Sequence, residues 1–164
     1  MNNLIPGLST NLLTQNPQDV GTTVQLLLLL TVLSLAPSIL ILMTSFTRIV
    51  IVLGFVRTSL GTQQMPPNQV IIGLALFLTF FIMAPVFSQV NHDAIQPYMK
   101  GKITQTQAAE KAEAPFKTFM AKQTRQKDLE LFLNYGHYSQ PKSVQAIPIS
   151  ALIPAYTISE LKTA

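Results

Sequence analysis

Two long apolar segments joined by a polar turn constrain this chain more than any other feature. The first segment covers residues 20–56, the turn covers residues 57–69 and the second segment covers residues 70–87. The only charged side chains in all three are Arg48 and Arg57. A run of about 18 or more apolar residues with few charges is long enough to cross a bilayer as a helix. The sequence therefore predicts an all-α membrane protein built on a helical hairpin.

The first apolar segment is longer than a bilayer requires. Its 37 residues would form a helix about 55 Å long, whereas the hydrocarbon core is about 30 Å thick. Pro37 has no N–H group, and its ring would clash with the carbonyl of Leu33, so we predict a kink or break at Pro37. Part of this segment must then face protein instead of lipid.

One stripe of the first segment is polar. When the segment is drawn as a helix, five side chains fall within an arc of about 100°: Thr31, Ser34, Ser38, Ser45 and Arg48. Small and hydroxyl side chains on an apolar helix favour contact with another helix. Two alternatives remain open. The hydroxyls could bond to carbonyls of their own helix, and Arg48 could extend to the cytoplasmic headgroups instead of meeting a partner or water.

The second apolar segment also has a face suited to packing. Gly73, Phe77, Phe80 and Ala84 recur at i, i+4, i+7 and i+11 of a helix. Glycine and alanine let another backbone approach closely, and the phenylalanines fill the space between them. The alternative is that the two aromatic rings face lipid. Pro85 follows this face, and we predict that it ends or bends the helix.

The distribution of basic residues predicts how the hairpin is inserted. Pro66 and Pro67 break the chain between the two segments, and Arg57 lies in the same turn. Residues 1–19 contain no Lys or Arg, and cytoplasmic loops are the ones enriched in these residues. We therefore expect a cytoplasmic turn, an extracytoplasmic N-terminal tail and an extracytoplasmic domain over residues 88–164.

The predicted extracytoplasmic domain, residues 88–164, reads as a set of small helices. It carries fifteen of the eighteen charged residues of the chain. Thr104 and Gln107 have the spacing of a capping box and predict a helix start. Pro115 is suited to the first turn of a second helix, and a third is expected over residues 128–136 with a glycine at its end.

No reactive constellation is visible in the sequence. The chain has no cysteine, and His92 and His137 lie 45 residues apart with no ligand set at metal spacing. Acidic pairs such as Asp128 and Glu130 lie among lysines and read as solvated helix faces. We therefore predict no catalytic, cofactor or metal site, and the interspersed charges do not form a nucleic-acid patch. A freestanding ion channel or small-solute transporter remains the alternative function, although the apolar segments contain no acidic residue.

Three stretches carry a family resemblance: LMTSFTRIVIVL, RTSLGTQQMPPNQVIIGLALFLTFFIMAPVF and ISELKTA. They resemble the family of the flagellar biosynthetic protein FliP, which flagellar and injectisome type III secretion systems share. The resemblance covers nearly the whole chain from Val20 to Ala164. It implies a multi-pass subunit of the export gate, located in the bacterial inner membrane at the flagellar basal body, with a structural and gating role.

The resemblance also implies partners. Members of the family form a pentameric ring of like subunits with FliQ-type and FliR-type subunits and other export membrane components, and unfolded flagellar proteins pass through this ring. Members continue beyond SELKTA into two further apolar helices with a methionine-rich constriction, whereas this sequence stops at Ala164. We therefore expect a helix start at Ser159 that frays, and we expect Glu160 and Lys162, as candidate subunit contacts, to lose neighbours.

Overall fold

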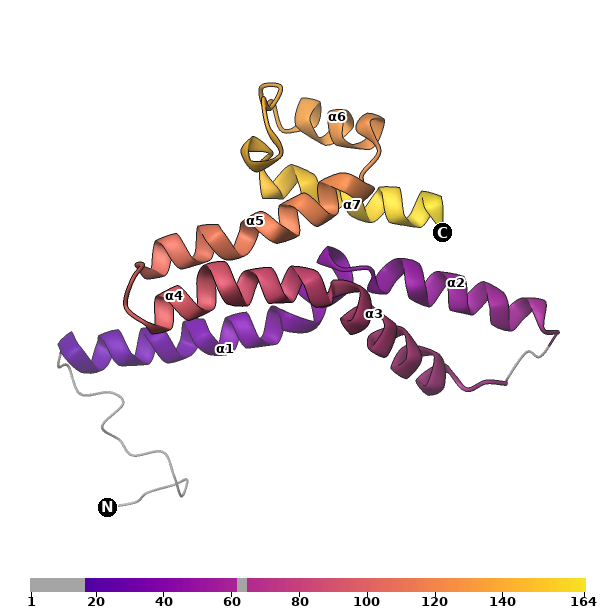
Figure 1. Ribbon diagram of the computed structural model, residues 1–164, viewed down its shortest axis with the longest axis horizontal. Coiled ribbons are helices and arrows are strands. Elements are labelled where there is room, and N and C mark those ends of the chain that lie inside the picture. Colours follow the sequence, from indigo (N-terminus) through magenta and orange to yellow (C-terminus); the bar gives the residue numbers. More distant parts are fainter. Residues whose placement is uncertain (1–16, 62–64) are drawn as a thin grey trace, which may run out of the picture. The chain divides into compact units, whose positions relative to one another are not determined.

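The computed structural model describes residues 17–61 and 65–164, which contain helices and no strand (Figure 1). Most of the predicted N-terminal tail and three residues of the turn lie outside the described residues. The chain divides into two compact units, residues 1–38 and 39–164, and each is described by itself.

The first apolar segment forms two helices, α1 (Pro17–Met43) and α2 (Phe46–Ser59). Of the predicted kink or break at Pro37, the break is corrected, because α1 continues through this proline and ends at Met43. The break lies at Thr44 and Ser45. Around it, side-chain hydroxyl groups donate hydrogen bonds to backbone carbonyls of α1. The hydroxyl of Thr44 bonds to the carbonyl of Leu40, and the hydroxyl of Thr47 donates to the carbonyl of Ile41 at 2.7 Å.

The second apolar segment also extends further than predicted. Helix α3 (Asn68–Val90) is followed without interruption by a π-helical turn η2 (Asn91–Ile95) and by α4 (Gln96–Met99). Pro85 lies inside α3 and does not end it, which corrects the expected end near Phe87. A proline removes one backbone hydrogen bond, and the remaining backbone hydrogen bonds maintain the helix.

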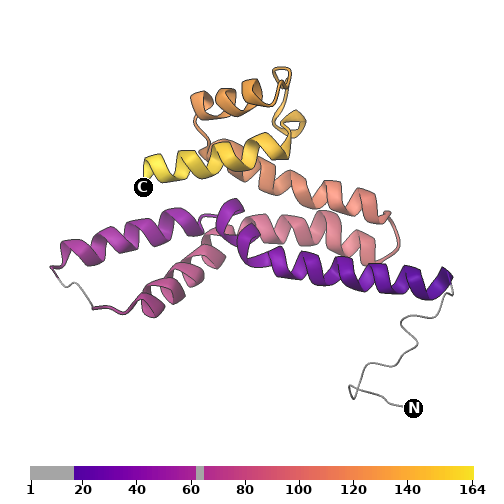
Figure 2. The same cartoon turned by 180° about the vertical axis from the view of Figure 1, so that it is seen from behind.

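Helix α2 packs against α3 as a hairpin within the larger unit (Figures 1 and 2). The buried face of α3 consists of residues four apart in sequence: Ile71, Ala75, Thr79 and Met83. At the turn, the Arg57 guanidinium donates a hydrogen bond to the side-chain oxygen of Asn68 and so joins the two ends. The peptide bond before Pro66 is cis, and Pro67 occupies the N-cap position of α3.

The remaining helices lie in the second half of the chain. They are α5 (Gln105–Gln123), α6 (Gln126–Tyr135), the short 3-10 turn η3 (Val144–Ala146) and α7 (Ile149–Thr163). The capping box is confirmed: the backbone N–H of Gln107 donates to the Thr104 hydroxyl, and the Thr104 N–H donates to the Gln107 side chain.

Two predicted helix starts in this domain are corrected. Pro115 is buried inside α5, which runs through it as one helix. Ser159 does not begin a helix either, because α7 starts at Ile149, directly after Pro148, and Ser159 lies in its interior. Pro148 occupies the N-cap of α7. An N–H group at the start of a helix has no partner within that helix, so a proline, which has no N–H, loses no hydrogen bond there.

A cluster of apolar side chains holds α5, α6 and α7 together. Its centre consists of four buried residues from α5, α7 and the segment between η3 and α7: Met120, Ile147, Leu152 and Tyr156. Phe119 packs against Tyr156 edge to face, with ring centroids 6.1 Å apart. Met43, at the end of α1, also packs against this cluster. The end of α1 is therefore part of the same core as the helical domain.

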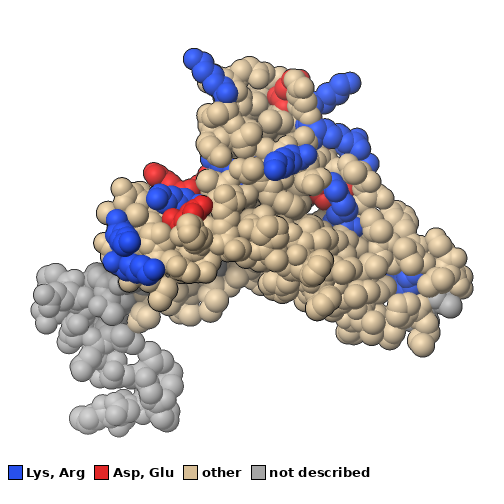
Figure 3. All heavy atoms as spheres, in the orientation of Figure 1, with Lys and Arg blue, Asp and Glu red and all other residues tan. Residues whose placement is uncertain are grey.

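The helix from Asn68 to Met99 is long and apolar enough to cross a membrane. Within the described part of the chain, a second span is reached only if Leu29–Met43 and Phe46–Ser59 count together as one bent span. On the face shown in Figure 3, charged side chains gather over α5 to α7 and are sparse over α2 and the first half of α3. On this face, the charged side chains are therefore concentrated away from the most apolar helices.

Candidate functional site

The helix break between α1 and α2 lies against α7 and forms a group of polar contacts that we call the polar junction. It consists of one backbone carbonyl and four side chains from the break, α2, α5 and α7: Thr44, Arg48, Gln123, Tyr156 and Glu160. Because α2 belongs to the hairpin and α7 to the helical domain, the polar junction links these two parts.

Arg48 is the central residue of the polar junction. One of its terminal nitrogens, Nη2, lies 2.5 Å from Oε1 of Glu160, and the other, Nη1, donates to Oε1 of Gln123 at 3.2 Å. The side chain of Arg48 is 32% exposed, whereas that of Glu160 is 2% exposed. Removing a carboxylate from water costs roughly several kcal/mol unless a partner compensates its charge. Arg48 supplies that compensation.

The chemistry of Glu160 is set by its burial. Burial raises the pKa of this carboxyl above its usual range, although the charge and hydrogen bond of Arg48 act in the opposite direction. Glu160 is therefore a carboxyl group that takes up a proton more readily than a solvated glutamate does.

Tyr156 fixes the helix break from the other side. Its hydroxyl donates to the carbonyl of Thr44 at 2.7 Å, and both residues are buried. Burial, and next the nearby charge of Glu160, raise the pKa of the Tyr156 phenol. The phenol therefore stays neutral and keeps its proton for the carbonyl, which the break has left without a helical partner.

A second polar cluster lies beside the polar junction, between α6 and the last turns of α7. Asp128 is buried, accepts a hydrogen bond from the Ser159 hydroxyl at 2.8 Å and forms an ion pair with Lys162. The Ser159 oxygen in turn accepts from the backbone N–H of Arg125 at 3.0 Å. The bonds from Lys162 and then Ser159 hold the pKa of Asp128 below its usual range. This cluster ties the C-terminal turns of α7 to α6.

The side chains of the predicted polar stripe in the first segment differ in their contacts. The hydroxyls of Thr31 and Ser34 each donate to a carbonyl four residues earlier, at 2.8 Å, as the alternative reading required. Ser38 is exposed, and Ser45 is buried at the break with no hydrogen-bond partner for its hydroxyl among the described residues. Arg48 meets Glu160 of the same chain, so these two predicted site residues lie together.

The predicted packing face of the second segment is exposed in this chain. Phe77 is 68% exposed and Phe80 is 53% exposed. A side-chain carbon added at Gly73 would meet no atom within 4 Å, and Ala84 is also exposed. The face is open within this chain, and its role as a subunit interface stays a prediction.

Sequence reasoning missed Tyr156, Thr44 and Gln123, and it assigned Asp128 to a solvated helix face. No local pattern marks the first three, because each acts on a residue at least 75 positions away. Asp128 carried a weak signal, since it precedes the apolar pattern of α6 and so lies at the edge of the buried face.

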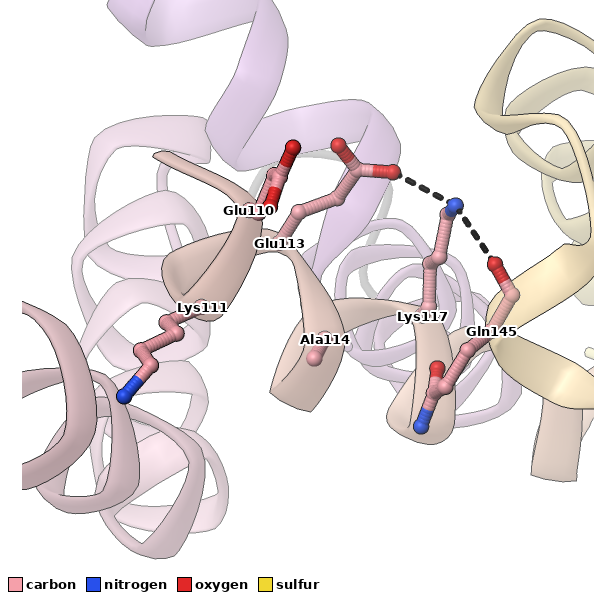
Figure 4. Close-up of a pocket in the computed structure, with 6 residues that line it drawn as sticks. All are labelled: Glu110, Lys111, Glu113, Ala114, Lys117 and Gln145. Carbon is pink, nitrogen blue, oxygen red and sulfur yellow. Dashed lines mark hydrogen bonds and ion pairs between the residues drawn. The ribbon is translucent and has the colours of Figure 1, made fainter. Parts of the chain in front are cut away.

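A surface pocket of about 380 Å³ lies along α5, apart from the polar junction (Figure 4). It is lined by Glu110, Lys111, Glu113, Ala114, Lys117 and Gln145. Lys117 pairs with Glu113 at 2.6 Å and donates to the Gln145 carbonyl at 3.2 Å, whereas Lys111 points away from them. Among the described residues, no group of three or more His, Cys, Asp or Glu could hold a metal ion.

Comparison with known proteins identifies the family. Residues 29–164 match the FliP family. The flagellar biosynthetic protein FliP of Bacillus subtilis is 64% identical over 149 residues, which are 91% of this chain and 67% of that protein. The FliP of Aquifex aeolicus is 49% identical over 144 residues, 87% of this chain and 60% of that protein. The FliP of Pectobacterium carotovorum is 44% identical over 160 residues, 98% of this chain and 62% of that protein. The chain thus spans 60% to 67% of the length of these three relatives, and it belongs to the FliP family.

Proposed function

We propose that this chain is a structural and gating subunit of the flagellar type III protein export gate. The observation that carries the proposal is its membership of the FliP family over residues 29–164. Because the chain spans only part of the length of its relatives, the activity, substrates and partners of the whole protein come to it only as part of this proposal. Together with FliQ-type and FliR-type subunits, copies of the chain form the channel through which unfolded flagellar proteins cross the inner membrane.

The apolar helices support a multi-pass position in that membrane. The helix from Asn68 to Met99 has the length and composition of a span. Leu60, within the turn, is 67% exposed, and the turn contains the basic residue Arg57. An excess of Lys and Arg favours the cytoplasmic side. The turn is therefore cytoplasmic, and the domain of α5 to α7 is extracytoplasmic.

The open face of α3 supports assembly into a ring. Gly73, Phe77, Phe80 and Ala84 are all exposed in the single chain, whereas the opposite face of α3 is already buried. A glycine and an alanine flanking two aromatic rings allow a neighbouring helix to approach closely. This face packs against another gate subunit.

The polar junction supports a mechanical role for the ion pair. Helix α2 has no fully buried residue of its own, so Arg48 supplies a specific contact between α2 and α7. A buried ion pair fixes one geometry better than apolar packing does in some systems. The polar junction therefore sets how the hairpin is held against the helical domain when subunits assemble.

Affinity purification from membranes of the host bacterium tests the proposal. A tagged chain should recover untagged copies of itself together with unlike gate subunits, and deletion of its gene should stop the appearance of flagellin in the medium. A freestanding channel or transporter predicts a chain recovered without unlike subunits and normal flagellin export in the deletion strain. That pair of results would overturn the proposal.

The orientation has its own test, because the chain contains no cysteine. Cysteines introduced as Leu60→Cys and Lys122→Cys should differ in their reaction with a membrane-impermeant thiol reagent added to spheroplasts. We expect labelling at position 122 only. Labelling at position 60 without labelling at position 122 would reverse the orientation.

A further inference from the structure

The C-terminal turns of α7 contact two different helices at once. Helix α7 lies between α6 and α2 (Figures 1 and 2). The hydroxyl of Ser159 donates to Asp128 of α6 at 2.8 Å, and the next residue, Glu160, accepts from Arg48 of α2 at 2.5 Å. Consecutive residues of a helix point about 100° apart. These two neighbouring residues therefore connect α6 and the hairpin through one turn of α7.

Polar contacts, and not apolar packing, hold this part of α7 in place. Beyond Tyr156, the buried residues of α7 are Ser159 and Glu160, which are 0% and 1% exposed. Leu161, between them and the end of the helix, is 56% exposed. The position of this turn therefore depends on its hydrogen bonds and ion pairs.

The contacts with α6 lie on one face of this turn. Lys162 is three residues after Ser159, so it lies on the same face, and it forms an ion pair with Asp128. Arg125, at the N-cap of α6, donates from its backbone N–H to the Ser159 hydroxyl at 3.0 Å. Its guanidinium donates to the carbonyl of Lys162 at 3.3 Å and to the hydroxyl of Thr163 at 3.1 Å. The start of α6 is therefore attached to the face of α7 beside the one that carries Glu160.

We propose that residues 159–163 of α7 couple the hairpin to α6, so that loss of the Arg48 contact loosens the attachment of α6. The inference rests on the proposed role of the polar junction. It goes beyond that role because it assigns a response to a helix that the polar junction does not include.

The coupling follows from the burial of Glu160. Without Arg48, its carboxylate is buried with no opposite charge to compensate it, which is strongly unfavourable. Rotation of this turn of α7 brings the carboxylate to water and relieves that cost. Because Ser159 and Lys162 belong to the same turn, the rotation moves them away from Asp128. Coupling between two contacts is reciprocal, so loss of the Asp128 contacts also loosens the Arg48 contact.

Hydrogen–deuterium exchange of backbone amides in the purified full chain tests the coupling. Arg48→Met should accelerate exchange over α6, residues 126–135, by about tenfold or more, because an uncompensated buried carboxylate favours the rotated turn. Residues 105–114 of α5 should exchange as in the parent. Arg57→Met is the matched control, because Arg57 lies at the other end of α2 and bonds to Asn68. Unchanged exchange over α6 in Arg48→Met, or equal acceleration over α5 and α6, would overturn the proposal.

A double variant separates the coupling from a simple loss of contact between α2 and α7. Arg48→Met with Glu160→Leu contains no buried carboxylate at this position, so nothing drives the rotation of the turn. Exchange over α6 should therefore return to nearly the rate of the parent. Exchange that stays as fast as in the single variant would contradict the coupling.

The reciprocal experiment does not require an Arg48 variant that folds. Asp128→Asn weakens the contacts with Lys162 and Ser159, so exchange over residues 46–52 of α2 should accelerate. Glu130→Gln is the matched control, because the Glu130 carboxylate accepts from Gln126 of the same helix at 2.7 Å. Equal exchange over α2 in these two variants would refute the coupling. The purified chain contains no export partners, so this result is independent of the co-purification that tests the export function.

Discussion

The hydroxyl of Tyr156 donates a hydrogen bond to the backbone carbonyl of Thr44 across 112 positions of sequence, at 2.7 Å. The carbonyl belongs to the break between α1 and α2, where helical partners are missing. Tyr156, a residue of the helical domain, thereby supplies a hydrogen-bond donor to a carbonyl at the break in the apolar segment.

Loss of this hydroxyl should destabilise the chain without removing the ring. Tyr156→Phe leaves a buried carbonyl without a partner, which costs about 1–3 kcal/mol, and the thermal midpoint in detergent should fall by several degrees. Tyr135→Phe is the matched control, because Tyr135 is 86% exposed and should leave the midpoint unchanged. Equal midpoints for the two variants would argue against a stabilising role for the bond.

Asp128 predicts how stability responds to acid. Its pKa is lowered in the folded chain, chiefly by the bond from Lys162, so its contribution is present above the unfolded value of 3.8. That contribution is lost as the pH falls through the folded pKa. Asp128→Asn should therefore be less stable than the parent at neutral pH, and the difference should shrink below pH 3.8. Denaturant midpoints measured along a pH series check this, and a difference that stays constant would contradict it.

The end of α6 gives a pair of opposite effects. His137 has a φ of 53°, a left-handed conformation that costs roughly 1–2 kcal/mol for a residue with a side chain. Glycine relieves that cost at an entropic penalty of about 0.5–1 kcal/mol, so His137→Gly should be neutral to stabilising.

At Gly136, φ is −84°, but an added side-chain carbon would lie 2.5 Å from the ring of Tyr138. Gly136→Ala should therefore lower the thermal midpoint, and a midpoint equal to or above that of the parent would show that the ring moves away freely.

The ends of helices show where sequence reasoning was sufficient and where it was not. The capping box at Thr104 and Gln107 was correctly predicted, because both partners lie within one turn. Pro37 was expected to kink or break a helix, Pro85 to end or bend one, and Pro115 to begin one. Each lies inside a helix that continues past it. A proline removes a single hydrogen bond, and for the buried Pro115 packing against other helices offsets that loss.

The candidate site shows the same limit. Arg48 stood out in the sequence because a charge in an apolar segment requires an explanation. Glu160 was chosen only through the family resemblance, and nothing local connected it to Arg48, which lies 112 positions earlier. The contact depends on how α2 and α7 pack, and periodicity within one helix carries no information about that.

The open face of α3 predicts a defect in assembly. Gly73→Leu should block close approach of a neighbouring helix and reduce the yield of rings on native gels, with insertion into the membrane preserved. Gly54→Leu on α2 is the matched control, since neither glycine has an atom of another residue near the added carbon. Equal ring yields for the two variants would remove α3 from the interface.

The most direct test of the account is a pair of substitutions at the polar junction, read out by the amount of folded chain and by flagellin export in the host. Arg48→Met alone leaves the carboxylate of Glu160 buried without its partner, which costs about 3–5 kcal/mol. Replacing both members by apolar residues of similar size, as in Arg48→Met with Glu160→Leu, is often close to neutral. We predict that the single variant loses folded chain and export, and that the double variant recovers most of the folded chain. A single variant that folds and exports like the parent, or a double variant no more stable than the single one, would contradict the claim that this ion pair holds the hairpin to the helical domain.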